Sequence, residues 1–241
     1  MQINNSILLI TGANRGIGKS LVLQSLEKGA NKIYATARNI DSLNEIVAIN
    51  PQKIIPIELD ITDRQQVSDV ANKTNDINIL INNAGILAVG SIIDDSLEMV
   101  IRDMDTNYFG TLNMIRSFVP VLKNNSESAI ANLLSIVSLS NMPVLGGYSA
   151  SKSAAFSMTQ AVRAELIDKN ISVHSIYPGP VDTDMAKDFE MEKASPDDVA
   201  LNILNGIENG DEDIFPDQMA SQCHQMWENN PKDLEKQFGT M

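Results

Sequence analysis

Apolar and β-branched residues gather in six short runs along the chain, and segments with helical spacing lie between them. Most of the runs lack the alternation of apolar and polar positions seen in half-exposed strands, as expected for strands buried on both faces. The predicted strands are Ile7–Ile10, Lys32–Ala37, Lys53–Leu59, Ile77–Asn82, Ala129–Ser135 and Ile171–Tyr177. This alternation of strand and helix predicts an α/β fold with a parallel sheet, right-handed crossovers and helices on both faces.

The chain of 241 residues is expected to form one domain, because no internal repeat, low-complexity tract or Pro/Gly-rich linker divides it. Residues 182–196 interrupt the strand–helix rhythm with charged residues and interspersed methionines, and we expect them to form a mobile lid. Residues 214–241 form a C-terminal extension that could cover the sheet edge or contact a second subunit, and the subunit contact is slightly favoured. Its larger apolar residues are Met219, Met226, Trp227, Leu234 and Phe238.

Composition and charge exclude several kinds of protein. A formal net charge of −13 argues against nucleic acid as a partner. No segment approaches the roughly 20 apolar residues of a membrane span, and the first strand begins too early for a signal peptide. With Cys223 as its single cysteine, the chain is expected to be a reduced, cytoplasmic protein. His174 and His224 lie far apart in the sequence and are expected to be structural or exposed, so we expect no metal site.

A glycine-rich turn, TGANRGIGKS, follows the first predicted strand and leads into a predicted helix. Such a turn exposes backbone N–H groups and the positive end of the helix dipole, which suits a pyrophosphate. Gly12, Gly16 and Gly18 have the spacing GxxxGxG rather than GxGxxG. The turn therefore predicts a dinucleotide site, and a plain tight turn is the alternative.

The second predicted strand ends at Ala37 and Arg38, where an NAD-binding site usually has an acidic residue for the ribose hydroxyls. A guanidinium at this position can pair with a 2′-phosphate, and Arg15 could reach the same phosphate from the glycine turn. The pattern predicts NADP(H) rather than NAD(H). The alternative is that both arginines are ordinary surface charges.

Tyr148 and Lys152 stand four residues apart at the start of a predicted helix, so that they share one helix face. A cation in this position can lower the pKa of a phenol. Taken alone, this pair is common on surface helices and predicts little.

Together these motifs resemble those of the short-chain dehydrogenase/reductase family, in its compact single-domain branch, over roughly residues 7–183. The matching segments are TGANRGIG, Asp60 in LDIT, NNAG at residues 82–85, Asn107 in DTNYFG, Ser135 thirteen residues before Tyr148, YxxxK at residues 148–152, and PGPVDT at residues 178–183. The resemblance implies a single-domain, Rossmann-type, doubly wound parallel sheet. It also implies four catalytic residues, Asn107, Ser135, Tyr148 and Lys152. The implied NADP(H) site contains Gly12, Asn14, Arg15, Gly16, Ile17, Gly18, Arg38, Asp60, Ile61, Asn83, Ala84, Gly85, Tyr148, Lys152, Pro178, Gly179, Val181 and Thr183.

The resemblance implies an oxidoreductase that interconverts a small carbonyl compound and an alcohol. Tyr148 would be the general acid, Ser135 would orient the carbonyl, and Asn107 would hold a water that connects Lys152 to solvent. Ser138 and Ser140 compete with Ser135, but neither has the family's interval to Tyr148. Asp60 could instead cap the helix that begins near Asp63.

Other functions are possible for this fold. They are a non-catalytic NADP-binding regulator, a sugar-nucleotide epimerase of the longer branch, and, least supported, a serine hydrolase. The resemblance also implies a homodimer or homotetramer formed by the helices around Asn107 and after Tyr148. Six apolar residues are expected near the substrate, although several could equally be core: Leu87, Val89, Met142, Val144, Leu145 and Met185.

Overall fold

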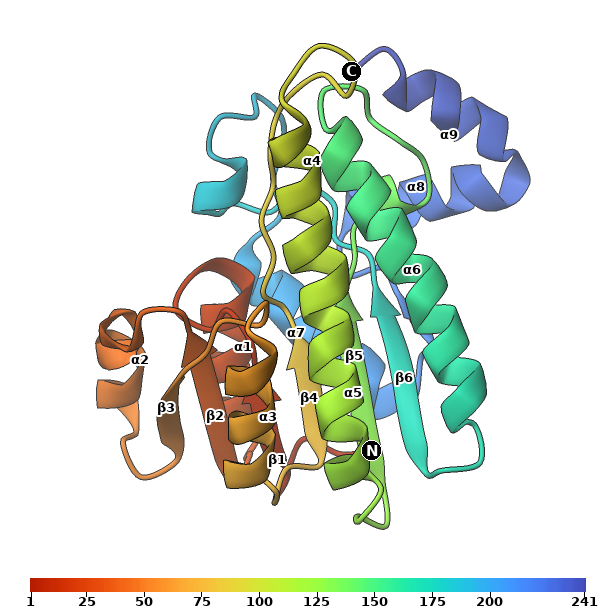
Figure 1. Cartoon of the computed structure of the whole chain (residues 1–241). Helices are drawn as coiled ribbons and strands as arrows, with labels where there is room; N and C mark the ends of the chain where they lie inside the picture. Colours follow the sequence, from red (N-terminus) through yellow and green to blue (C-terminus); the bar gives the residue numbers. More distant parts are fainter.

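A seven-stranded parallel sheet forms the centre of the computed structural model, which describes residues 1–241 (Figure 1). Its strands are β1 (Ile7–Ile10), β2 (Lys32–Ala37), β3 (Ile54–Glu58), β4 (Ile79–Asn82), β5 (Ser128–Leu133), β6 (Ile171–Ile176) and β7 (Asp213–Ile214), in the order β3-β2-β1-β4-β5-β6-β7. The predicted α/β fold class is confirmed, and the six predicted strands are present with ends that differ by at most two residues. The edge strand β7 was not predicted.

Nine α-helices connect and cover the strands. They are α1 (Gly16–Glu27), α2 (Asn44–Ile49), α3 (Arg64–Lys73), α4 (Leu97–Met104), α5 (Thr111–Leu122), α6 (Gly146–Leu166), α7 (Pro196–Asn209), α8 (Gln218–Asn229) and α9 (Pro231–Phe238). Short 3₁₀ turns occur at Ile40–Leu43, Ile136–Ser138 and Asp184–Ala186, and a π-helical segment, Asp105–Gly110, joins α4 to α5.

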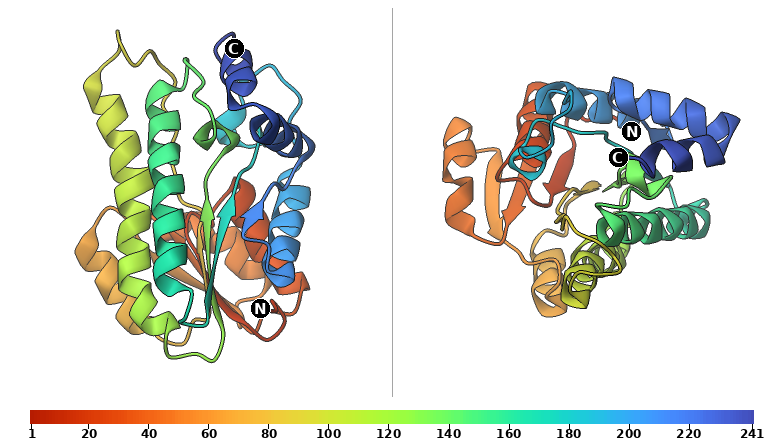
Figure 2. Two further views of the ribbon diagram at one scale, coloured as in Figure 1. Left: turned by 90° about the vertical axis from the view of Figure 1, so that its right-hand side faces the viewer. Right: turned by 90° about the horizontal axis from the view of Figure 1, so that it is seen from above.

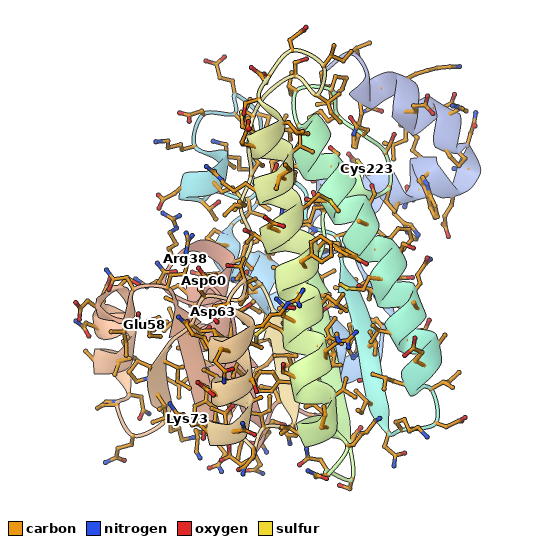
Figure 3. All side chains as sticks on the ribbon, in the orientation of Figure 1. Arg38, Glu58, Asp60, Asp63, Lys73 and Cys223 are labelled. Atoms are coloured by element: carbon orange, nitrogen blue, oxygen red, sulfur yellow. The ribbon has the colours of Figure 1, made fainter.

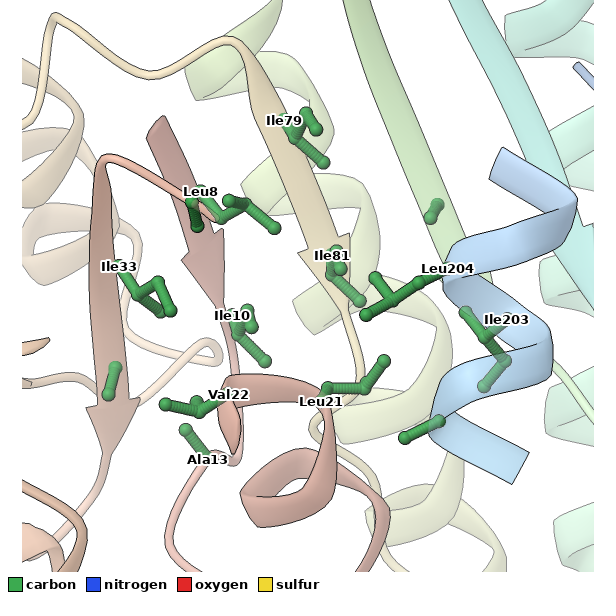
Figure 4. Close-up of a cluster of buried hydrophobic side chains, with 14 of the residues drawn as sticks. Leu8, Ile10, Ala13, Leu21, Val22, Ile33, Ile79, Ile81, Ile203 and Leu204 are labelled. Atoms are coloured by element: carbon green, nitrogen blue, oxygen red, sulfur yellow. The ribbon is translucent and has the colours of Figure 1, made fainter. Parts of the chain in front are cut away.

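Two hydrophobic cores lie on opposite faces of the sheet, because successive strand residues point to opposite sides. Leu8 and Ile10 of β1 pack with residues of α1 and α7, including Leu21 and Ile203 (Figure 4). Leu9 instead packs with residues of α3, α5 and α6. The view from above in Figure 2 shows these two helix layers with the sheet between them.

The strand order reverses between β1 and β4, so that the crossovers on the two sides of this point run to opposite edges of the sheet. In open α/β sheets, ligands bind outside the carboxyl ends of the strands at such a point. These ends point to the top of Figure 1, toward the C-terminus, whereas the N-terminus lies at the opposite end. None of the helices combines the length and the apolar character that crossing a lipid bilayer requires.

The C-terminal helices α8 and α9 pack inside their own chain, beside the carboxyl edge of the sheet (Figure 2). Leu234 and Phe238 are completely buried there, in a third cluster that also contains Met142, Leu145 and Tyr148. The favoured prediction, a contact with a second subunit, is therefore wrong for these two residues. They bury their apolar surface against the loop that precedes α6, and so support one wall of the predicted site.

Candidate active site

One large cavity follows the carboxyl edge of the sheet, with a volume of about 1540 Å³. All eighteen residues predicted to bind the cofactor line it. They come from the loops after β1, β2, β3, β4 and β6 and from the start of α6, which are far apart in the sequence. Three of the four predicted catalytic residues, Ser135, Tyr148 and Lys152, also line the cavity, whereas Asn107 lies behind its wall.

The glycine turn after β1 is held open by backbone geometry and by the loop after β4. Gly12 has φ +64° and Gly16 has φ +52°, in the left-handed region that favours glycine. The Asn83 amide donates to the carbonyl oxygens of Thr11 at 2.8 Å and of Gly12 at 3.0 Å. A Cβ on Gly18 would lie 2.1 Å from the Gly12 oxygen, so that only glycine lets the helix start this close to the turn.

The two arginines predicted to hold a 2′-phosphate have different surroundings. Arg38 is exposed just beyond β2, near Asp60, which follows β3 (Figure 3). Arg15 lies across the cleft, where its guanidinium is 3.2 Å from the carboxylate of Asp184. The cation of the glycine turn is thus paired with Asp184 in the predicted lid, a contact that the sequence alone does not predict.

Some cavity residues near Arg38 were also missed from the sequence. They are Asn39, Ser42, Thr62 and Arg64. Their only signal was that they follow β2 and β3 within a few residues.

Asp60 does not cap the following helix, contrary to the alternative interpretation. Its carboxylate accepts hydrogen bonds from the backbone N–H of Thr62 at 2.9 Å and from the Thr62 hydroxyl at 2.7 Å. Asp63 caps α3 by accepting from the N–H groups of Gln65 and Gln66. The Asp60 loop is therefore fixed by its own side chain, and Asp60 remains on the cavity wall.

Tyr148 and Lys152 lie one turn apart in the first part of α6, and both are buried. The Lys152 ammonium lies 5.7 Å from the centre of the Tyr148 ring and donates a 2.7 Å hydrogen bond to the carbonyl oxygen of Leu133, at the end of β5. The strand end therefore fixes the lysine, and the helix fixes the tyrosine beside it.

The expectation that Lys152 lowers the pKa of the Tyr148 phenol is not met by the protein groups alone. Burial is the largest cause and raises that pKa, a hydrogen bond with the Ser135 hydroxyl lowers it, and the charge of Asp103 raises it, so that the pKa of Tyr148 is about 12. The physical reason is that removal of water disfavours the phenolate, while the ammonium is directed at the Leu133 oxygen.

Burial has the corresponding effect on Lys152, because removal of water disfavours its ammonium form. The pKa of Lys152 falls from 10.5 to about 8, although the charge of Asp103 acts in the opposite direction. An ammonium that loses its proton near neutral pH can take part in proton exchange.

Ser135 follows β5 and caps the short 3₁₀ turn Ile136–Ser138. Its hydroxyl accepts from the N–H of Val137 at 3.3 Å, and its own N–H donates to the Ser138 hydroxyl at 3.2 Å. Ser138 thus supports the turn, and neither Ser138 nor Ser140 lines the cavity. Of the three candidates, only Ser135 lies on the wall beside Tyr148.

Asn107 lies in the π-helical segment between α4 and α5, an irregularity often found at functional sites. Its side chain accepts from the N–H of Ile86 at 2.9 Å and donates to the Ile86 carbonyl and the Ser151 hydroxyl, each at 2.9 Å. A Cβ on Gly85 would lie 3.1 Å from the Asn107 oxygen and 3.5 Å from the Lys152 nitrogen, so that these two groups face each other across the glycine. Asn107 positions the loop after β4 next to Lys152.

Asp103, one turn before Asn107, is a buried acid that was not among the predicted site residues. It is completely buried, one of its oxygens has no hydrogen-bond partner, and the other accepts only a long bond of 3.4 Å from the N–H of Ala88. Burial raises its pKa. Nothing in the local sequence distinguished this aspartate from the neighbouring Asp105, which is exposed.

The apolar residues predicted to lie near the substrate mostly line the cavity beyond Tyr148. Five of the six do so: Leu87, Met142, Val144, Leu145 and Met185. Val89 does not, and it is 56% exposed on the surface. His174 is buried, with its ring nitrogens bonded to the Asp211 carbonyl and the Ser172 hydroxyl, so that its role is structural.

Comparison with known proteins gives consistent matches along most of the chain. The model of a family described as short chain dehydrogenase matches residues 6–194. A 3-oxoacyl-[acyl-carrier-protein] reductase of Thermotoga maritima is 32% identical over 193 residues, which cover 78% of each chain. An NADP-dependent 3-hydroxy acid dehydrogenase of Schizosaccharomyces pombe is 28% identical, with 93% of this chain and 95% of that protein covered. The crystal structure of a short chain dehydrogenase from Burkholderia cenocepacia, in complex with NADP, is 36% identical with a TM-score of 0.93 over 99% of both chains.

Proposed function

Because the chain belongs to the short-chain dehydrogenase family, we propose that it is an NADP(H)-dependent oxidoreductase that interconverts a ketone or aldehyde with an alcohol. One observation carries this proposal: Ser135, Tyr148 and Lys152 line the same cavity as the glycine turn. A non-catalytic NADP-binding regulator is not favoured, since it would need no such group of side chains beside the cofactor.

The residues at the glycine turn fit a dinucleotide. The left-handed glycines Gly12 and Gly16 shape the turn before α1, and Gly18 lets that helix begin in close contact with the Gly12 carbonyl. The backbone N–H groups at the start of α1 suit a pyrophosphate. The exposed guanidinium of Arg38 suits the 2′-phosphate of NADP, and the Burkholderia cenocepacia relative was crystallised with NADP. When bound, the nicotinamide supplies or accepts the hydride.

Tyr148 provides the proton in this proposal. A phenol with a pKa of about 12 keeps its proton at neutral pH, and can donate it to a carbonyl oxygen that gains negative charge. The Ser135 hydroxyl donates a second hydrogen bond to the same oxygen. Lys152 stabilises the resulting phenolate, and Asn107 keeps the loop around Gly85 in place beside Lys152. Residues 182–196 are proposed to act as the lid.

Replacement of Tyr148 by phenylalanine tests this mechanism, because the change removes only the hydroxyl. We expect turnover in NADPH oxidation with carbonyl substrates to fall by about 100-fold or more, while the Kd for NADPH stays within threefold of the wild-type value. Tyr108→Phe is the matched control, since Tyr108 does not line the cavity. Unchanged turnover in Tyr148→Phe would remove Tyr148 from the role of acid.

We also propose that the protein forms a homodimer or homotetramer through α4. Leu97 and Ile101, one turn apart on α4, are 66% and 48% exposed in the single chain, which is unusual for large apolar side chains on one helix. Burial of these residues against a second copy would remove them from water. Light scattering after gel filtration is expected to give a dimer or tetramer, and Leu97→Glu with Ile101→Glu is expected to reduce its mass toward that of the monomer.

A further inference from the structure

The cavity is too large for one small ligand, and its two ends have different chemistry. Its volume of about 1540 Å³ exceeds the roughly 300–1,000 Å³ of a typical small-molecule site. The end beyond Tyr148 is called the substrate compartment here. Its lining residues are Ile136, Val137, Met142, Val144, Leu145, Asp184, Met185, Ala186, Asp188, Phe189, Glu190, Met191, Met219 and Met241.

Methionines dominate the walls of the substrate compartment. Five of the 11 methionines in the chain line it: Met142, Met185, Met191, Met219 and Met241. They come from the loop before α6, the lid segment, α8 and the end of the chain. Methionine side chains are flexible and polarisable, and so adapt to apolar ligands of different shapes.

The charges of the substrate compartment are all negative. No lysine or arginine occurs among its lining residues, which include Asp184, Asp188 and Glu190 of the lid segment. Asp184 is paired with Arg15, whereas Asp188 and Glu190 are exposed and have no ion-pair or hydrogen-bond partner for their side chains. The lid segment, residues 182–196, contains five acids and the two lysines Lys187 and Lys193, so that its net charge is negative. It therefore gives the entrance a negative potential, which repels anions.

Arg102 on α4 is the cavity-lining cation that could attract an anionic substrate against this repulsion. Among the other cations on the wall, Arg15 is paired with Asp184 and Lys152 is bonded to the Leu133 carbonyl, while Arg64 lies near Arg38. Asp105 lines the cavity three residues later on the same helical face. A carboxylate substrate would therefore depend on Arg102 and would have to pass Asp188 and Glu190.

We infer that the substrate is an uncharged, apolar carbonyl compound or alcohol, and that Asp188 and Glu190 select against carboxylate- and phosphate-bearing molecules. This inference rests on the proposed function, since it concerns the substrate of the same site. It differs from the substrates in the names of two relatives, a 3-oxoacyl-[acyl-carrier-protein] and a 3-hydroxy acid.

A pair of substrates that differ only in charge tests the inference: the neutral keto ester ethyl benzoylformate and the anion benzoylformate. At low ionic strength we expect kcat/KM for the ester to exceed that for the anion by at least about 10-fold, from the repulsion by two acids. Added salt should reduce the ratio, because it screens exposed charges. The double variant Asp188→Lys with Glu190→Lys should reduce the ratio to about threefold or less.

The matched control is Glu165→Lys with Asp168→Lys, which changes the net charge equally at the far end of α6 and should leave the ratio unchanged. A kcat/KM for benzoylformate equal to or above that for the ester would overturn the inference. If Arg102→Met then abolished turnover of benzoylformate, Arg102 would be the cation that binds the carboxylate. A ratio that responds equally to both double variants would also overturn the role of Asp188 and Glu190.

A binding measurement separates failure of this inference from failure of the proposed function. Calorimetric titration of Tyr148→Phe protein loaded with NADPH gives the affinities for ester and anion without turnover. Preferred binding of the ester without NADPH oxidation by the wild-type protein would contradict the proposed function and retain the inference. Preferred binding of the anion would contradict the inference whatever the turnover.

Discussion

Replacement of Lys152 by methionine should abolish turnover but stabilise the cofactor-free protein against unfolding. The lysine is buried, and its pKa falls from 10.5 to about 8. This difference corresponds to a penalty of about 3 kcal/mol for carrying the charge in the folded state at pH 7. Methionine keeps most of the stem and its packing, and removes the charge.

The substitution also removes a favourable contact. The ammonium donates to the carbonyl oxygen of Leu133 at 2.7 Å, and loss of this hydrogen bond costs about 1 kcal/mol. The free energy of unfolding of Lys152→Met should therefore exceed that of the wild-type protein by about 2 kcal/mol at pH 7.

The stability advantage of Lys152→Met over the wild-type protein should decrease as the pH rises. Because the pKa of Lys152 is lower in the folded state, the unfolded chain binds more protons between pH 8 and pH 10.5. The wild-type protein therefore recovers stability as the pH rises through this range, and the advantage of Lys152→Met should largely disappear by pH 10.

Urea unfolding at pH 7 and at pH 10, without added cofactor, measures both quantities. Lys123→Met is the control, since Lys123 is exposed at the end of α5 and its replacement should have little effect at either pH. If Lys152→Met is less stable than the wild-type protein at pH 7, or if its advantage does not change with pH, the electrostatic reasoning about this site is wrong.

Three further predictions concern other parts of the site. Arg38→Asp should reverse the preference for NADPH over NADH, with a loss of about 10-fold or more in kcat/KM for NADPH, because one charge-assisted contact is removed. The control Arg116→Asp, on the exposed face of α5, should keep the preference. An unchanged preference in Arg38→Asp would show that the 2′-phosphate is bound elsewhere. Gly18→Ala should weaken NADPH binding by about 10-fold or more, because its Cβ would overlap the Gly12 oxygen; fluorescence titration measures this, and wild-type affinity would contradict it. Asp103→Asn should raise the free energy of unfolding at pH 7, because burial raises the pKa of Asp103 in the folded state and its charge is therefore destabilising above that pKa. The gain in stability should vanish as the pH falls below 3.8, the ordinary pKa of an aspartate. Urea unfolding measures the gain, and one that persists below pH 3.8 would contradict this explanation.

The apolar pattern of the sequence predicted the long strands of the sheet but not its short or irregular elements. The six long strands are continuous apolar runs, and each was found with ends that differ by two residues or less. The strand β7 has only two residues and could not produce such a signal. The π-helical segment around Asn107 was missed for a related reason, since an irregularity of six residues is too short for the apolar pattern to reveal.

The motifs that line the cavity were recognised from their order and spacing, but their contacts were not. The pairing of Arg15 with Asp184 and the burial of Asp103 depend on segments that only the folded chain brings together. The rise in the pKa of Tyr148 beside Lys152 was not predicted for the same reason. Sequence spacing placed the two side chains on one face, but it could not show that Leu133 takes the ammonium or that both groups lose their water.

The position of the last two helices has a practical consequence for experiments on this protein. Phe238 supports the wall behind Tyr148, and Met241 lies on the cavity itself. A purification tag joined to Met241 would therefore sit at the entrance to the cavity and could be mistaken for an inhibitor in assays. The amino group of Met1 pairs with Glu127 at 2.7 Å at the opposite end of the sheet (Figure 1), where an attached peptide would leave the entrance free.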